Sequence, residues 1–240
     1  MFYRPLLVVL FNVLWPSAWG NVRELLGTLY LLYNIRGIYA KVPSFEYVGD
    51  FLSYDAVKTR RFDVLDEHMN MEIAWYICAL GFVFKDARRD GRWSRKQLDI
   101  VFHHSITLFM ICLCQWFNYN VLGLKTLWVL TFTNPLMDLG RIFKEIGMDT
   151  MALGVFMTFA GCFFYMRLYV YYVEIVRVCL FDCWPFYKDT WGLFGIYLIF
   201  NILHGVLYCM QWYWAGIIAN MVIGKSGLKR IFKPFIDCIP

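Results

Sequence analysis

The stretch DIVFHHSITLFMICLCQWF, residues 99–117, decides the class of this protein. After Asp99 it holds no acidic residue, lysine or arginine, and it is about as long as the 20-residue helix that crosses the hydrocarbon core of a membrane. It does hold two adjacent histidines, His103 and His104. Because lipid does not solvate imidazole, an ionisable residue inside a span marks a functional site, and this pair is the first candidate.

The composition of the whole chain indicates the same class. Of its 240 residues, 60% are hydrophobic, 20% are aromatic and 17% are charged, whereas soluble domains carry roughly 25% charged residues. We therefore expect an all-α integral membrane protein. No linker rich in Pro, Gly or Ser and no repeat of fixed period divides the chain, which indicates one membrane domain.

Apolar stretches predict six to seven transmembrane helices. They are residues 5–19, 23–40, 71–84, 98–117, 121–141, 151–178 and 191–223. Residues 1–40 fit either one span with an interfacial segment or a hairpin of two spans, and their first apolar run fits either a cleaved signal or an anchor.

Basic residues predict the orientation. They concentrate in KDARRDGRWSRK (85–96) and KSGLKRIFK (225–233), and such clusters beside spans mark the cytoplasmic side and can contact anionic lipid. From 85–96 onward every second connection carries the excess of Lys and Arg, while FDCWPFYKD (181–189) carries only Lys188. Nucleic acid is not expected as a partner, because these residues are needed to orient the chain.

The eight cysteines do not predict a metal or redox centre. They include no CxxC pair and no Cys/His spacing typical of zinc, so neither a metal nor a cofactor is expected. Cys179 and Cys183 share one connection and are either core thiols or a disulfide.

Polar side chains near the histidines extend the candidate site. Thr107 lies three and four positions beyond the pair and neighbours both on the helix surface. In 121–141, Asn134, Asp138 and Arg141 follow at i, i+4 and i+7 along one face. The alternatives are structural: buried histidines that join helices, and a local ion pair between Asp138 and Arg141 at the membrane surface.

Two further spans add candidates. The last span carries a polar stripe at steps of three, four and three: Asn201, His204, Tyr208 and Gln211. Arg167 lies in the middle of FFYMRLYVYY and needs a partner there. That partner is Glu174, an anionic lipid headgroup or a phosphate-bearing substrate.

These segments resemble the TLC-domain family, the membrane superfamily that contains the ceramide synthases. The matching features are HHSIT after a basic loop, TNPLMDLGRIFKEIGM, the arginine of FFYMRLYVY and NILHGVLYCMQWYWAGIIANMV. The resemblance covers about 65–223, leaving 1–64 as N-terminal spans with a mixed-charge loop and 224–240 as a basic cytoplasmic tail. It implies a TLC-like bundle of six to seven transmembrane helices around a cavity that takes a lipid chain.

The sequence also departs from the synthases. For them the resemblance implies acyl transfer from acyl-CoA to a sphingoid base, with paired histidines and an HDxxD element as the reactive core. Counted from His103, the HDxxD positions fall on Leu130, Thr131 and Asn134, so every polar member is replaced. The segment resembles the version seen in non-synthase TLC proteins, and Pro135 is predicted to kink the helix.

The leading hypothesis is therefore a protein that binds a lipid or acyl chain without ceramide synthase activity. Its cavity is predicted to be lined by His103, His104, Asn134, Asp138, Arg167, His204 and Gln211. A competing hypothesis is an acyl-CoA-dependent N-acyltransferase in which His103 or His104 is the acyl carrier or base and Asp138 supports it.

The partners and the compartment each admit two predictions. Membrane lipids are the expected partners, and the chain is also compatible with a structural accessory subunit of a larger membrane complex, with other membrane subunits as partners. A transporter is disfavoured because inverted repeats are lacking. The family implies the endoplasmic reticulum, with a mitochondrial or other organellar inner membrane as the second possibility.

Overall fold

The computed structural model describes residues 3–15, 20–39, 63–189 and 191–225, and every regular element in these ranges is a helix. The helices are α1 (Tyr3–Leu14), α2 (Gly20–Tyr39), α5 (Asp63–Asp90), α6 (Arg95–Trp116), α7 (Asn120–Thr131), α8 (Asn134–Glu145), α9 (Asp149–Phe163), α10 (Trp184–Tyr187) and α11 (Trp191–Lys225). Between α9 and α10 the chain continues through the π-helical segments Phe164–Val170, Tyr172–Val176 and Val178–Asp182.

Among the described residues, three continuous helical stretches are long and apolar enough to cross a membrane. They are Arg95–Trp116, which is α6, Asp149–Tyr187, which runs from α9 through the π-helical segments to α10, and Trp191–Gly224, which lies within α11. Apart from end residues, the described residues of every predicted apolar stretch are helical, with one interruption in 121–141, so the prediction of an all-helical membrane protein is confirmed. In the N-terminal part the described residues form two helices, which is compatible with either alternative for residues 1–40. With 12 residues, α1 is about 18 Å long and too short to span the roughly 30 Å hydrocarbon core alone.

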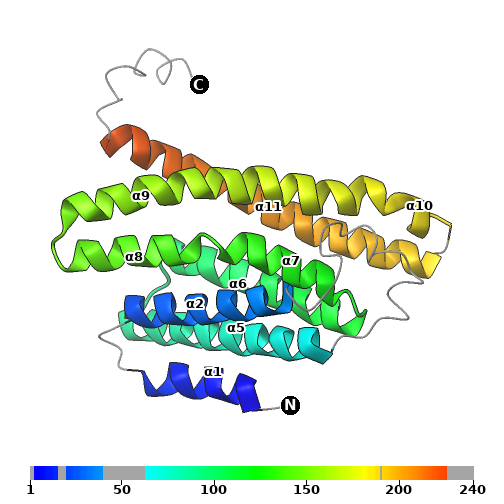
Figure 1. Cartoon of the computed structure of the whole chain (residues 1–240), viewed down its shortest axis with the longest axis horizontal. Coiled ribbons are helices and arrows are strands. Elements are labelled where there is room, and N and C mark those ends of the chain that lie inside the picture. Colours follow the sequence, from blue (N-terminus) through cyan, green and yellow to red (C-terminus); the bar gives the residue numbers. More distant parts are fainter. Residues whose placement is uncertain (1–2, 16–19, 40–62, 190, 226–240) are drawn as a thin grey trace.

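Connections alternate between the two ends of the bundle as the basic residues predict. The α5–α6 connection and the α8–α9 turn lie at one end, and the α6–α7 turn and α10 lie at the other (Figure 1). The basic segment 225–233 falls outside the described residues except for Lys225. Residues 40–62, where the mixed-charge loop is predicted, also lie outside them.

Helix α6 begins and ends where its sequence dictates. Ser94 accepts a hydrogen bond from the Gln97 amide at 3.2 Å, and the Ser94 amide donates to Gln97 Oε1 at 2.8 Å. This reciprocal capping box satisfies amides that have no partner inside the helix. After Trp116 the chain turns at Asn118, whose φ of 61° lies in the left-handed region that asparagine tolerates better than most residues.

The predicted span 121–141 is interrupted. Helix α7 ends at Thr131 and α8 starts at Asn134, with Pro135 in the first turn of α8. Proline lacks the amide hydrogen and its ring clashes with the carbonyl four residues earlier, so a helix cannot continue unbroken through it. The last carbonyls of α7 consequently lack donors from their own helix.

The core lies where α5, α6 and α7 meet the π-helical segments and α11. Its buried side chains include Met69, Ile111, Leu127, Tyr171 and Leu207. α1 packs against α5, and α2 packs against α8. Cys179 and Cys183 are buried free thiols, so the disulfide considered for them is not formed.

Candidate functional site

Arg167 is the centre of a polar cluster at the α7–α8 break. It lies in the π-helical segment Phe164–Val170, whose wider turn is shown by the Tyr171 amide donating to the carbonyl of Met166, five residues back. Such wide turns are rare and occur frequently at functional sites. The arginine is buried, with 7% of its surface exposed, and its guanidinium lies 5.1 Å from the centre of the Phe163 ring.

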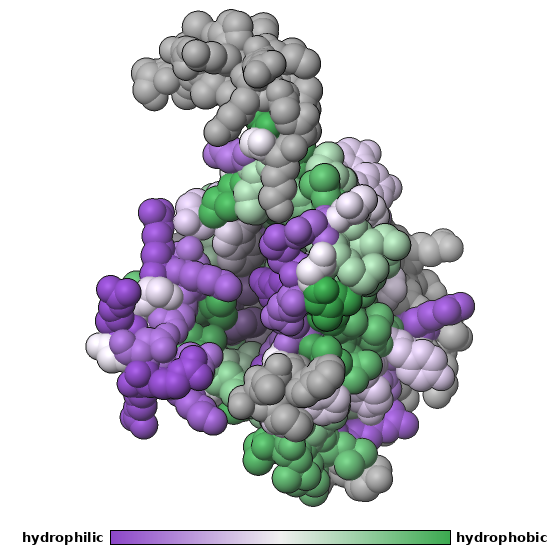
Figure 2. Space-filling view, turned by 90° about the vertical axis from the view of Figure 1, so that its left-hand side faces the viewer, coloured by the Kyte–Doolittle hydropathy of each residue, from purple (hydrophilic) through white to green (hydrophobic). Residues whose placement is uncertain are grey.

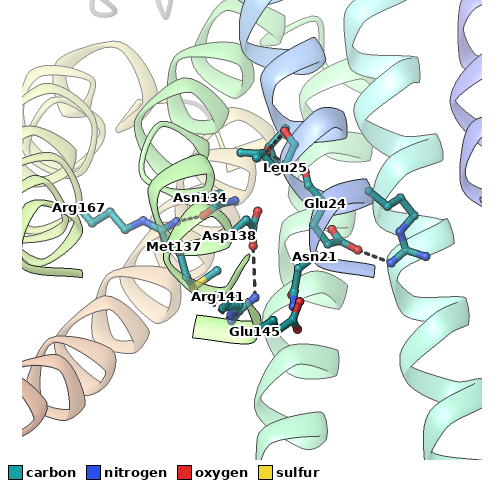
Figure 3. A network of polar contacts seen from close by, with 11 residues as sticks. Asn21, Glu24, Leu25, Asn134, Met137, Asp138, Arg141, Glu145 and Arg167 are labelled. Atoms are coloured by element: carbon teal, nitrogen blue, oxygen red, sulfur yellow. Dashed lines mark hydrogen bonds and ion pairs between the residues drawn. The ribbon is translucent and has the colours of Figure 1, made fainter. Parts of the chain in front are cut away.

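Four hydrogen bonds hold the guanidinium, and all go to neutral oxygens. Nε donates to Thr133 Oγ at 2.9 Å, and Nη1 donates to Gln211 Oε1 at 3.3 Å. Nη2 donates to the Leu130 carbonyl. It also donates to Asn134 Oδ1, as Figure 3 shows. Arg167 thereby connects α7, α8 and α11.

Glu174 was one candidate partner for Arg167, but in the structure Glu174 pairs with Lys125. Its carboxylate lies 2.8 Å from Lys125 Nζ, and only 8% of the Lys125 side chain is exposed. The reason is positional, because Glu174 lies in the next π-helical segment and faces α7 nearer the middle of that helix. The arginine instead meets the end of α7.

The break in the helix explains why an arginine fits there. A carbonyl in the last turn of α7 has no in-helix donor, and leaving it unbonded in a membrane interior is costly. Arg167 supplies a donor to Leu130 from outside the helix. Two of the positions that correspond to HDxxD therefore have a structural role, because Leu130 and Asn134 accept hydrogen bonds from Arg167.

The histidine pair contacts aromatic rings. His103 lies edge-to-face against Trp214 with centroids 4.9 Å apart, and His104 against Tyr76 at 5.1 Å. Both side chains are half-buried, and neither buried Nδ1 has a hydrogen-bond partner. Among the described residues no hydrogen bond or ion pair joins either imidazole to a carboxylate. Thr107 beside them is buried, and its hydroxyl also lacks a partner.

Within the described ranges no hydrogen bond or ion pair joins Asp138 to the histidines. Asp138 is 2% exposed and forms an ion pair with Arg141 Nη1 at 3.3 Å. Figure 3 shows its side chain on the side of α8 that faces Glu24 of α2, while Asn134 points to Arg167. The residues predicted on one face of 121–141 therefore diverge, because the faces of the short helix α8 contact different neighbours.

The polar stripe of the last span faces the bundle at several depths. His204 is buried, with Nδ1 2.8 Å from the Phe200 carbonyl and Nε2 3.4 Å from Thr126 Oγ. Tyr208 donates to the Leu168 carbonyl at 3.2 Å, and Asn201 to the Cys179 carbonyl at 3.3 Å. Of the four stripe residues, Gln211 is the one that bonds to Arg167.

A buried pair on α5 was missed from the sequence. His68 Nε2 lies 3.2 Å from Glu72 Oε1, and each side chain is 1% exposed. Tyr76 follows one turn later, so the three share a face at i, i+4 and i+8 of HMNMEIAWY. The available signal was this spacing, but the apolar run begins near residue 71, which leaves His68 at the edge of the predicted span.

A small pocket lies at the other end of the bundle from the histidine pair. It is lined by Tyr119, Leu122, Cys179, Cys183, Tyr187, Ile196, Tyr197, Phe200 and Asn201. Asn201 thus belongs to this pocket and not to the surroundings of Arg167. In the part of the chain that the structure describes, no three His, Cys, Asp or Glu side chains are grouped as metal ligands.

Comparison with known proteins agrees with this architecture. The TLC domain family model matches residues 52–220, which is more than half of the chain. The chain belongs to the TLC domain family. Ceramide synthase 4 of Bos taurus is 24% identical to this TLC-domain protein over 171 residues, which cover 70% of the chain and 41% of the synthase. The chain therefore spans less than half the length of that relative.

Proposed function

We propose that this TLC-domain protein binds a lipid or acyl chain among its membrane helices and does not transfer an acyl group. One observation carries the second part. Of the three positions that correspond to HDxxD, Leu130 and Asn134 bind the guanidinium of Arg167, and no carboxylate stands there. The resemblance associates acyl transfer with acidic side chains at these positions, whereas here the positions bind a positively charged side chain.

The surroundings of the imidazoles support the absence of transfer. General-base catalysis needs an imidazole held in the right tautomer, usually by a carboxylate or carbonyl. His103 and His104 contact Trp214 and Tyr76 through their rings. The His68–Glu72 pair offers an imidazole beside a carboxylate, but at 1% exposure a substrate cannot reach it.

Lipid binding is supported by the end of the bundle that carries the α5–α6 connection. Figure 2 shows this end hollowed, with hydrophilic side chains on both sides and hydrophobic ones deeper inside. His103 and His104 lie within the first half of α6, about 12 Å from the helix start at this end. A polar headgroup near this end, with its chain among apolar helices, would match that distribution of polarity.

Two measurements on purified protein in nanodiscs test the proposal. Lipid extraction followed by mass spectrometry should recover a lipid at near-stoichiometric amounts. Incubation with acyl-CoA and a sphingoid base should yield no N-acyl product. A product that His104→Ala abolishes and the matched control Ser105→Ala retains would establish an acyltransferase instead, since Ser105 is the exposed neighbour of His104.

We also propose the endoplasmic reticulum as the compartment. The support is membership of the TLC domain family together with similarity to a ceramide synthase. Fluorescence microscopy of tagged full-length protein tests it, with co-localisation to an endoplasmic reticulum marker expected. Localisation to mitochondria would overturn it.

A further inference from the structure

Arg167 carries a positive charge that no described acidic side chain balances. Its hydrogen bonds go to a hydroxyl, two side-chain amides and a backbone carbonyl. The carboxylates on the neighbouring elements are engaged elsewhere, Asp138 with Arg141 and Glu174 with Lys125. Neutral acceptors satisfy the N–H groups, but they do not cancel the charge.

A charge of this kind is costly among membrane helices. A charged side chain at the centre of a bilayer raises the free energy of insertion, and such residues are normally paired or line a polar path. An anion bound beside Arg167 would reduce that cost. The guanidinium has a donor for it, because arginine has five N–H groups and four of them make its hydrogen bonds within the protein.

The histidine pair faces the same region. His103 packs on Trp214, which lies one turn beyond Gln211 on α11, and Gln211 accepts a hydrogen bond from Arg167. His104 packs on the ring of Tyr76. Each imidazole has a buried Nδ1 without a hydrogen-bond partner. Neutral imidazole can donate from one ring nitrogen, and a tyrosine hydroxyl can donate as well. Donors from two helices, α5 and α6, thus lie in the region of this one cation.

We propose that the lipid bound by this protein carries an oxyanion, a carboxylate or a phosphate, which lies between Arg167 and the His103–His104 pair. This inference rests on the proposed lipid-binding function and gives it a ligand class. The cation balances the charge, and imidazole N–H groups donate to the anion's oxygens. A neutral lipid of the same chain length leaves the charge of Arg167 uncompensated and binds more weakly.

Binding of matched lipids to the protein in nanodiscs tests the inference. The probes are a long-chain fatty acid, the fatty alcohol of equal length, and a lysophosphatidic acid with the same chain. Charge-assisted hydrogen bonds contribute about 1.5–3 kcal/mol, so the better acid should bind about 10- to 100-fold tighter than the alcohol. Whichever acid binds tighter identifies carboxylate or phosphate as the source of the oxyanion.

Two variants examine Arg167 itself. Arg167→Gln should remove the preference for acid over alcohol, whereas Arg177→Gln should keep it. Arg177 is a matched control, because it lies on the same long helix, its side chain is 44% exposed and it pairs with Asp182. If Arg167→Gln does not fold, Gln211→Glu replaces it by putting a carboxylate beside Nη1, which should balance the charge internally and lower the acid preference.

The outcomes separate the inference from the function on which it rests. Acid and alcohol binding equally to the wild type would overturn the anionic ligand and leave lipid binding intact. An acid preference that survives both Arg167→Gln and Gln211→Glu would also overturn it. Failure of all three probes to bind, with no lipid recovered on extraction, would overturn the lipid-binding function as well.

Discussion

The Nε–H of Arg167 donates a hydrogen bond to the hydroxyl of Thr133, 2.9 Å away, across 34 positions of sequence. The bond ties a π-helical segment to the residue that precedes α8. Together with the bond to the Leu130 carbonyl, it bridges the interruption that Pro135 imposes on α7 and α8. One arginine therefore stabilises a break in the bundle and supplies the charge of the candidate site.

Loss of this bridge should destabilise the fold. Arg167→Ala leaves several polar groups without a donor, and we expect it to lower the free energy of unfolding by about 3 kcal/mol. Thr133→Val removes one of the bonds and should cost about 1–2 kcal/mol. Thermal unfolding in detergent measures both, with Arg177→Gln as the control expected to remain within about 0.5 kcal/mol of wild type. Equal stability of all three variants would contradict the bridge.

The His68–Glu72 pair should show strong coupling. Removing one partner of a buried pair costs about 3–5 kcal/mol, whereas replacing both with apolar residues of similar volume is often neutral. We therefore expect Glu72→Met and His68→Leu each to destabilise the protein more than the double variant does. A double-mutant cycle by thermal unfolding measures the coupling. Additive effects would mean that the two side chains act independently.

Close packing of α2 on α5 depends on Gly27. A Cβ at this position would overlap the ring of Trp75, which is buried. Gly27→Ala should therefore reduce stability by about 1–3 kcal/mol, the usual range for overpacking. Gly81→Ala on α5 is the matched control, because its Cβ would meet nothing within 4 Å. If Gly27→Ala unfolds at the temperature of Gly81→Ala, the two helices are not packed as described.

The capping box at the start of α6 should support the helix that carries the histidine pair. Ser94→Ala removes the acceptor for the Gln97 amide and should cost about 1 kcal/mol. Ser94→Asp, which can accept the same bond, should retain most of the stability of the wild type. Thermal unfolding of the two variants checks this, and a Ser94→Ala variant as stable as the wild type would show that the cap contributes nothing.

Several features follow from local sequence and were predictable. The spans are defined by continuous apolar length, and the break at Pro135 follows from the missing amide of proline. The positions of the connections follow from their lysines and arginines. Family membership was predictable because HHSIT, the Pro135 segment and the Arg167 segment keep their order and spacing.

The partners of buried polar groups were not predictable. Arg167 had several candidate partners. In the structure it donates to neutral oxygens of α7, α8 and α11, because the helix break leaves the Leu130 carbonyl beside the arginine without a donor from its own helix. Asp138 was predicted near the histidines but faces α2. The His68–Glu72 pair lies where the sequence shows only the flank of a span.

The sequence alone determined that this chain is a helical membrane protein of the TLC type. Hydrophobic length, charge distribution and the effect of proline are local properties, which can be read from neighbouring residues. Only the tertiary structure decided which side chains share a site. In lipid each polar group must find its partner within the protein, so the choice depends on which helices meet at its depth. Sequence spacing along a single helix cannot supply that information.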